Sequence, residues 1–180
     1  MMNALLRICR AIDRLSEQAA RIADWLVLAA SLVSAGNAAM RYLLSYSSNA
    51  WLEIQWYMFA AMVFLGASYT LRRNEHVRVD IFYSSVSDRT RLWIDAFGFL
   101  FVLIPVGIYV TILSFPFFWS SYLVGETSSN AGGLLLWPIK IVLPLGFALL
   151  TLQAVSELIK RILVLSGNID LDTHYERPTQ

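Results

Sequence analysis

The sequence contains very few of the residues from which cofactor and metal sites are built. Among its 180 residues are one cysteine, Cys9, and two histidines, His76 and His174. A single cysteine excludes an intramolecular disulfide and any cluster held by several thiolates. Two histidines are too few for a haem with paired axial histidines or for a conventional zinc site. We therefore predict no catalytic centre, no metal and no cofactor, and we do not expect an enzyme.

Charge is scarce as well. Charged residues make up 15% of the chain and hydrophobic residues 57%, whereas soluble domains are about a quarter charged and about half apolar. A 20.4 kDa chain with a mean hydropathy of +0.57 cannot bury so many hydrophobic residues in one core, because small domains leave much of their surface exposed. A net charge of +1 gives no reason to expect nucleic acid as a partner. The composition predicts an integral membrane protein.

Four stretches are long and apolar enough to cross a bilayer, which takes about 20 mostly apolar residues. They are roughly residues 25–44, 51–71, 96–119 and 134–159. Prolines lie within or at the ends of the last two, and we expect kinks there rather than breaks because neighbouring helices can satisfy the freed backbone groups. The sequence therefore predicts an all-α integral membrane protein with four transmembrane helices.

The first 21 residues follow another pattern. Apolar residues recur at helical spacing with arginines and one glutamate between them; the apolar set is Leu5, Ile8, Cys9, Ile12, Leu15 and Ala19. This pattern suits an amphipathic helix that lies flat among the headgroups with its arginines toward anionic lipid; the alternative is a polar lead-in to the first span. We divide the chain into an interfacial helix (1–21), a four-span membrane domain (22–162) and a cytoplasmic tail expected to be disordered (163–180).

The connections between the spans differ sharply in basic residues. Twelve lysines and arginines lie before span one, between spans two and three, or after span four. Only Arg41 and Lys140 lie toward the other side, and the connections there contain none. Because positively charged loops stay in the cytoplasm, both termini are predicted to be cytoplasmic.

The densest polar cluster is "RRNEHVRVDIFYSS", residues 72–85. His76 and Asp80 have helical ligand spacing, but no third ligand accompanies them, and "HVRVDI" alternates as an extended segment does. We interpret the arginines as a topology determinant and Asp80 as the N-cap of a short interfacial helix. Ser87 or Asp88 is then expected to cap the approach to span three.

A few polar or aromatic residues lie near the ends of the spans. Arg41 and Glu53 flank a short outer turn and are predicted either to form an ion pair or to extend separately to the headgroups. Gln55 and Gln153 are candidates for hydrogen bonds between helices, and Trp56 belongs to an outer aromatic belt. The outer loop with Glu126 either touches a soluble partner or is an inert connection. The span centres lack the polar residues of a transport pathway, so the chain resembles an accessory subunit.

Several stretches resemble the small permease subunit of the tripartite ATP-independent periplasmic (TRAP) transporters. They are "RYLL", "NAWLEIQWYMFAAMVFLGASYTLRRNEHVRVDIFY", "SDRTRLWIDAFG" and "GGLLLWPIKIVLPLGFALLTLQ". The resemblance covers about residues 20–162, and its most specific part is span two with the motif that follows it. Many members carry two adjacent acids where this chain has Glu53 followed by Ile54. The variants "EIQWYMF" and "AGGLLLWPIK" are most similar to a branch labelled for mannitol or chloroaromatic compounds.

The resemblance implies a bacterial inner-membrane subunit that partners a large multi-span permease and a periplasmic solute-binding receptor. The large subunit is expected to carry the substrate and sodium sites, and the small one to scaffold it and help dock the receptor during uptake of an organic acid or similar small solute. Residues considered for structural or partner contacts are Arg41, Glu53, Gln55, Trp56, Asp80 and Glu126. The alternatives are an autonomous four-helix carrier and a membrane anchor subunit of another complex.

Overall fold

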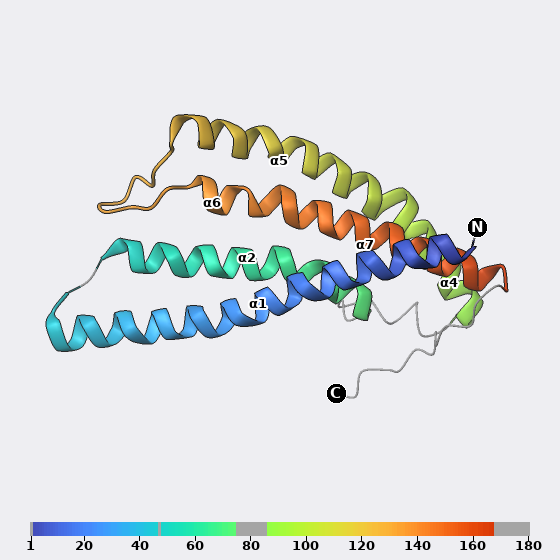
Figure 1. Ribbon diagram of the computed structural model, residues 1–180, viewed down its shortest axis with the longest axis horizontal. Helices are drawn as coiled ribbons and strands as arrows, with labels where there is room; N and C mark the ends of the chain where they lie inside the picture. Colours follow the sequence, from blue (N-terminus) through green and yellow to red (C-terminus); the bar gives the residue numbers. More distant parts are fainter. Residues whose placement is uncertain (1, 47, 75–85, 168–180) are drawn as a thin grey trace.

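Four long helical segments lie side by side in the computed structural model, which describes residues 2–46, 48–74 and 86–167 (Figure 1). They are α1 (Met2–Leu44), α2 (Asn49–Arg73), α4 (Asp88–Gly98) with its continuation, and α6 (Trp137–Lys140) with α7 (Val142–Leu165). The continuation of α4 is a π-helical turn, η1 (Phe99–Leu103), and α5 (Ile104–Val124). Each of the four segments is long and apolar enough to span a membrane. The predicted all-α fold with four transmembrane helices is confirmed.

The first span differs from the prediction because α1 runs for 43 residues without a break. At a rise of about 1.5 Å per residue it is roughly 64 Å long, more than the thickness of a bilayer with its headgroups. The structure thus has no helix boundary at residues 21–22. The apolar set expected to face lipid is divided, because Cys9 and Ala19 are buried in the bundle while Ile8 and Leu15 stay exposed. The first turns of α1 are therefore packed against other helices along one face.

Local sequence explains where several helices begin and end. The hydroxyl of Ser48 accepts a hydrogen bond from the amide of Ala50 (3.3 Å) at the start of α2, and that of Ser87 accepts one from Thr90 (3.4 Å) at the start of α4. These are N-caps, and the prediction for Ser87 is confirmed. Asp80, His76 and the tail beyond residue 167 lie outside the described residues, so the predictions made for them stay predictions.

Span three stays helical through its prolines, whereas span four is divided into α6 and α7 at residue 141, between Pro138 and Pro144. α5 continues through Pro116, and Pro105 is the second residue of α5, just after η1. A π-helical turn absorbs one extra residue within a helix, so α4 and α5 form one continuous segment. Pro144 is buried inside α7. Span three thus remains one helical segment, as expected where neighbouring groups satisfy the backbone, and the kinks expected at the prolines stay a prediction.

The last span occupies the centre of the bundle: α7 contacts α1, α2, α4 and α5. Glycines permit its closest approaches. A Cβ added at Gly146 would lie 2.6 Å from the Cβ of Phe64 on α2, and one at Gly107 on α5 would lie 2.2 Å from the hydroxyl of Thr151. Helices in membranes use small residues in this way to bring their backbones together. Buried Leu71, Phe99 and Ala154 form the apolar core where α2, η1 and α7 meet.

The two ends of the bundle differ. At one end lie the start of α1, the end of α2, α4 and the end of α7 (Figure 1); we call it the basic end because ten of the chain's 14 lysines and arginines stand in these described segments. At the other end lie the end of α1, the start of α2 and the connection 125–136 (Figure 1); we call it the hairpin end. Towards the basic end α1 crosses from α2 to α7 (Figure 1).

Candidate functional site

Charged side chains are confined to the ends of the spans. Residues 25–40, 54–71, 96–125 and 141–156 contain none. At each end of the bundle, polar side chains from helices distant in sequence form a cluster. Within the described residues, no group of three or more histidine, cysteine, aspartate or glutamate side chains is arranged to hold a metal ion. The two clusters are therefore the candidate functional sites.

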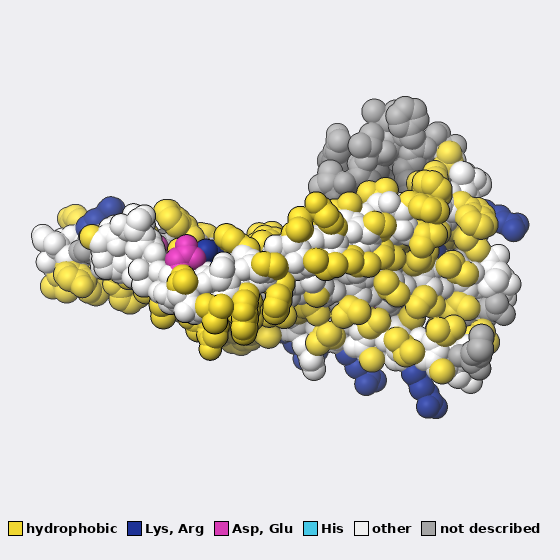
Figure 2. All heavy atoms as spheres, turned by 90° about the horizontal axis from the view of Figure 1, so that it is seen from above, with side chains coloured by type: hydrophobic (Ala, Val, Ile, Leu, Met, Phe, Trp, Pro, Cys, Tyr) yellow, Lys and Arg dark blue, Asp and Glu magenta, His cyan; other side chains and the backbone are white. Residues whose placement is uncertain are grey.

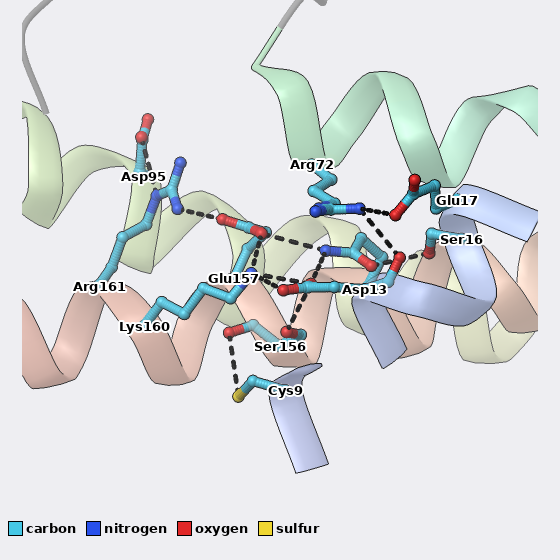
Figure 3. A network of polar contacts seen from close by, with 11 residues as sticks. Cys9, Asp13, Ser16, Glu17, Arg72, Asp95, Ser156, Glu157, Lys160 and Arg161 are labelled. Carbon is cyan, nitrogen blue, oxygen red and sulfur yellow. Dashed lines mark hydrogen bonds and ion pairs between the residues drawn. The ribbon is translucent and has the colours of Figure 1, made fainter. Parts of the chain in front are cut away.

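The basic-end cluster is centred on Asp13 of α1 and Lys160 of α7 (Figure 3). The ammonium of Lys160 donates to both carboxylate oxygens of Asp13 at 2.8 Å. Gln153, which is fully buried, donates to Asp13 (2.9 Å) and accepts from the hydroxyl of Ser16 (2.7 Å). The expected interhelical hydrogen bonding of Gln153 is confirmed, and it joins the first span to the last.

Glu157 extends this cluster toward the third span (Figure 3). Its carboxylate accepts from Lys160 (2.8 Å) and from Arg161 (2.6 Å). Arg161 also donates to Asp95 of α4 at 3.1 Å, and the side chains of this pair are each 12% exposed. On the other side, Arg72 of α2 donates to the backbone carbonyl of Asp13 at 3.1 Å. One continuous polar network thus joins all four spans.

The basic-end network holds four carboxylates (Asp13, Glu17, Asp95 and Glu157) and three cations (Arg72, Lys160 and Arg161), and each of them forms an ion pair with at least one of the others. Buried ions that are paired and hydrogen-bonded avoid most of the penalty of leaving water. Every charge in this network is therefore countered by an opposite charge within the chain. Its arrangement is suited to fixing the relative positions of the helices.

Most of this network escaped the sequence reasoning, because charges at helix ends were interpreted as topology signals or solvated ends. The spacing of polar and small residues in the sequence did indicate which faces of α1 and α7 carry the network. Cys9, Asp13, Ser16 and Ala20 recur at intervals of three and four residues, which places them on one face of a helix. Glu157, Lys160 and Arg161 have the same i, i+3, i+4 spacing on α7.

The hairpin-end cluster is built around Glu53 in the first turns of α2. Glu53 is 3% exposed. It accepts hydrogen bonds from the hydroxyl of Ser128, the amide of Asn130 (2.7 Å) and the backbone N–H of Leu134 (2.7 Å). Three donors from one loop satisfy the buried charge. Glu53 therefore fastens the connection 125–136 to the second span.

Further contacts hold the same connection. Glu126 forms an ion pair with Lys140, and this hydrogen bond is the main reason that the pKa of Glu126 is lowered from its ordinary value. The hydroxyl of Tyr57 donates to the carbonyl of Leu135 at 3.1 Å. An isolated antiparallel bridge pairs residues 127 and 135. The connection 125–136 is consequently held at both of its ends and along its length.

At this end the structure excludes one of the two alternatives for Arg41 and Glu53, the ion pair, and it contradicts the bond expected for Gln55. Arg41 does not pair with Glu53: it is exposed at the end of α1, and the carboxylate instead faces the 125–136 connection. Gln55 does not bond across helices, because its amide donates to the carbonyl of Trp51 in its own helix at 2.9 Å. Trp56 is 62% exposed, and its role at a partner surface stays a prediction.

Comparisons with known proteins identify the family. A family model described as "Tripartite ATP-independent periplasmic transporters, DctQ component" matches residues 30–164. The match covers three quarters of the chain and reaches from the first span to the end of α7. Comparisons with curated proteins and with solved structures gave no match. The chain belongs to the DctQ component family of the tripartite ATP-independent periplasmic transporters and is a transporter component, not an enzyme.

Proposed function

We propose that this chain is the scaffolding subunit of a TRAP transporter: it braces a large permease subunit and helps to dock a periplasmic solute receptor. The observation that carries the proposal is the distribution of charge. The span centres contain no charged side chain, and the charged clusters at both ends have partners within the chain itself. A transport pathway needs polar groups near the midplane, so we assign the pathway to the large subunit.

The subunit lies in the bacterial inner membrane with both termini in the cytoplasm. The excess of basic residues at the end that holds the start of α1 and the end of α7 supports this orientation, since lysine and arginine are retained on the cytoplasmic side. The hairpin end then faces the periplasm, where the receptor arrives.

The connection 125–136 is the part of this chain that meets the receptor. Glu53, Glu126 and Tyr57 hold it in one conformation, and a preorganised surface loses less entropy when it binds. Arg41 and Trp56 are exposed towards the same end and are available to the large subunit. Uptake is driven by a sodium gradient acting on the large subunit, and the solute is an organic acid or a similar small molecule.

Reconstitution tests this function. Liposomes that contain this chain and a large TRAP permease subunit, supplied with a periplasmic receptor and a sodium gradient, should take up solute, and omission of any one component should abolish uptake. Full uptake by the large subunit and receptor alone would show that no scaffold is required. Uptake by this chain alone would instead favour an autonomous four-helix carrier.

A variant separates receptor docking from assembly. Glu53→Ala removes the acceptor of three hydrogen bonds and should weaken receptor-dependent uptake, while the two membrane subunits still copurify. The matched control is Asp24→Ala, which alters an exposed carboxylate of α1 that belongs to neither cluster. Equal uptake by the two variants would contradict the docking role of the 125–136 connection.

A further inference from the structure

Three arginines on the first turns of α1 have no ion-pair partner among the described residues. Arg7, Arg10 and Arg14, with Ala11, line a surface hollow of about 270 Å³. The nearest carboxylates in sequence are engaged elsewhere, since Asp13 pairs with Lys160 and Glu17 with Arg21 and Arg72. The hollow is therefore lined by positive charge that those two carboxylates do not neutralise.

The packing of α1 fixes the direction in which these arginines point. Cys9 and Ser16, each 1% exposed, lie on the face of α1 that packs into the bundle, and the Asp13–Lys160 ion pair locks that face. The three arginines follow the spacing i, i+3, i+7, which places them together on another face. In Figure 2, basic side chains project from one side of the wide end, and no acidic side chain is visible next to them on that face.

This part of α1 lies at the level of the lipid headgroups. Arg72, in the last turn of α2, donates to the backbone of Asp13, and Lys160 lies in the last two turns of α7. Asp13 thus stands where two spans end, which is the polar boundary of the bilayer. Ile8 and Leu15, 54% and 44% exposed, form an apolar edge roughly a third of a turn from the arginines. A basic edge next to an exposed apolar edge is the pattern of a helix at a membrane interface.

We propose that Arg7, Arg10 and Arg14 form a binding site for the headgroup phosphate of an anionic phospholipid. Guanidinium groups bind phosphate through paired, charge-assisted hydrogen bonds, and three of them around one hollow can surround a single headgroup while its acyl chains lie along Ile8 and Leu15. The site does not depend on the proposed transport role, because it requires only that the chain lies in a membrane.

The test uses the full-length protein in nanodiscs, with bound lipid counted by native mass spectrometry. Phosphatidylglycerol should be retained in preference to phosphatidylcholine. Arg10→Gln should weaken retention of phosphatidylglycerol about fivefold, the effect of the ~1 kcal/mol that one basic residue contributes near an anionic surface. Replacing all three arginines by glutamine should weaken it about 100-fold. The matched control, Arg89→Gln, removes an exposed arginine of α4 at the same end and should change retention less than twofold.

Each arm has an outcome that would overturn the site. Equal losses for Arg10→Gln and Arg89→Gln would show a diffuse attraction of the basic end rather than a site at α1. Equal retention of the two lipids would remove the requirement for an anionic headgroup. Displacement of the lipid by millimolar inorganic phosphate would identify a site for free anions. A triple variant that retains lipid like the wild type would refute the assignment even if it is less stable.

Discussion

The replacement Lys160→Met gives the strongest test of the basic-end network. It leaves Asp13 and Glu157 without the ammonium that they share, although the side chains of the three residues are only 15%, 7% and 16% exposed. Removing one partner from a buried ion pair costs about 3–5 kcal/mol. Because Gln153 still donates to Asp13 and Arg161 still donates to Glu157, we expect a loss at the lower end, about 3 kcal/mol.

The assay is reversible unfolding in mixed micelles of increasing denaturing detergent, with a double-mutant cycle that adds Asp13→Asn. Since the two residues contact each other, the double variant should lose less than the sum of the single losses by at least about 1 kcal/mol. The control Arg21→Gln breaks an exposed pair with Glu17 and should have a much smaller effect. Additive losses, or a Lys160→Met variant as stable as the control, would refute the role of the network.

Three further predictions concern other contacts. Glu53→Ala should speed hydrogen exchange at the N–H of Leu134, and unchanged protection would argue against the fastening role. Gly146→Ala should lower the free energy of unfolding by about 1–3 kcal/mol by overpacking. Gly36→Ala, with nothing within 4 Å of the added Cβ, should not destabilise the protein. Equal effects of the two substitutions would contradict the close approach of α7 to α2 at Gly146. The folded-state pKa of Glu126 is lowered, so the contribution of this residue to stability is present above its ordinary pKa and is lost as pH falls through the lower folded value. The wild type should therefore be more stable than Glu126→Gln at neutral pH and lose that advantage in acid. An advantage that stays constant with pH would refute the ion pair.

The spans were predictable because membrane insertion depends on composition over about 20 residues. Helix boundaries set by local chemistry were also readable, as the cap at Ser87 demonstrates. The continuation of α1 through residue 21 was not, because an apolar and small face that fits a neighbouring helix has the same periodicity as a face that binds lipid.

The partners of individual polar residues were less predictable than the helices. Arg41 and Glu53 are close in sequence on either side of a short turn, and this proximity suggested a pair. Glu53 instead binds residues 75–81 positions away, on a connection whose fold depends on where α5 and α6 bring its ends. Charge complementarity identifies which residues need partners, but only the tertiary arrangement selects among them.

The central position of α7 has a consequence for biosynthesis. Asp13 and Lys160 are separated by 147 residues, and translation proceeds at about 5–20 residues per second. Asp13 on the first span is therefore synthesised roughly 7 to 30 s before Lys160, its ion-pair partner. Span three contacts mainly α7, so it too lacks its main packing partner until that helix is synthesised. A nascent chain interrupted before α7 would have an unpaired carboxylate on its first span and a third span without its main packing partner, so the bundle is completed only when the last helix is made.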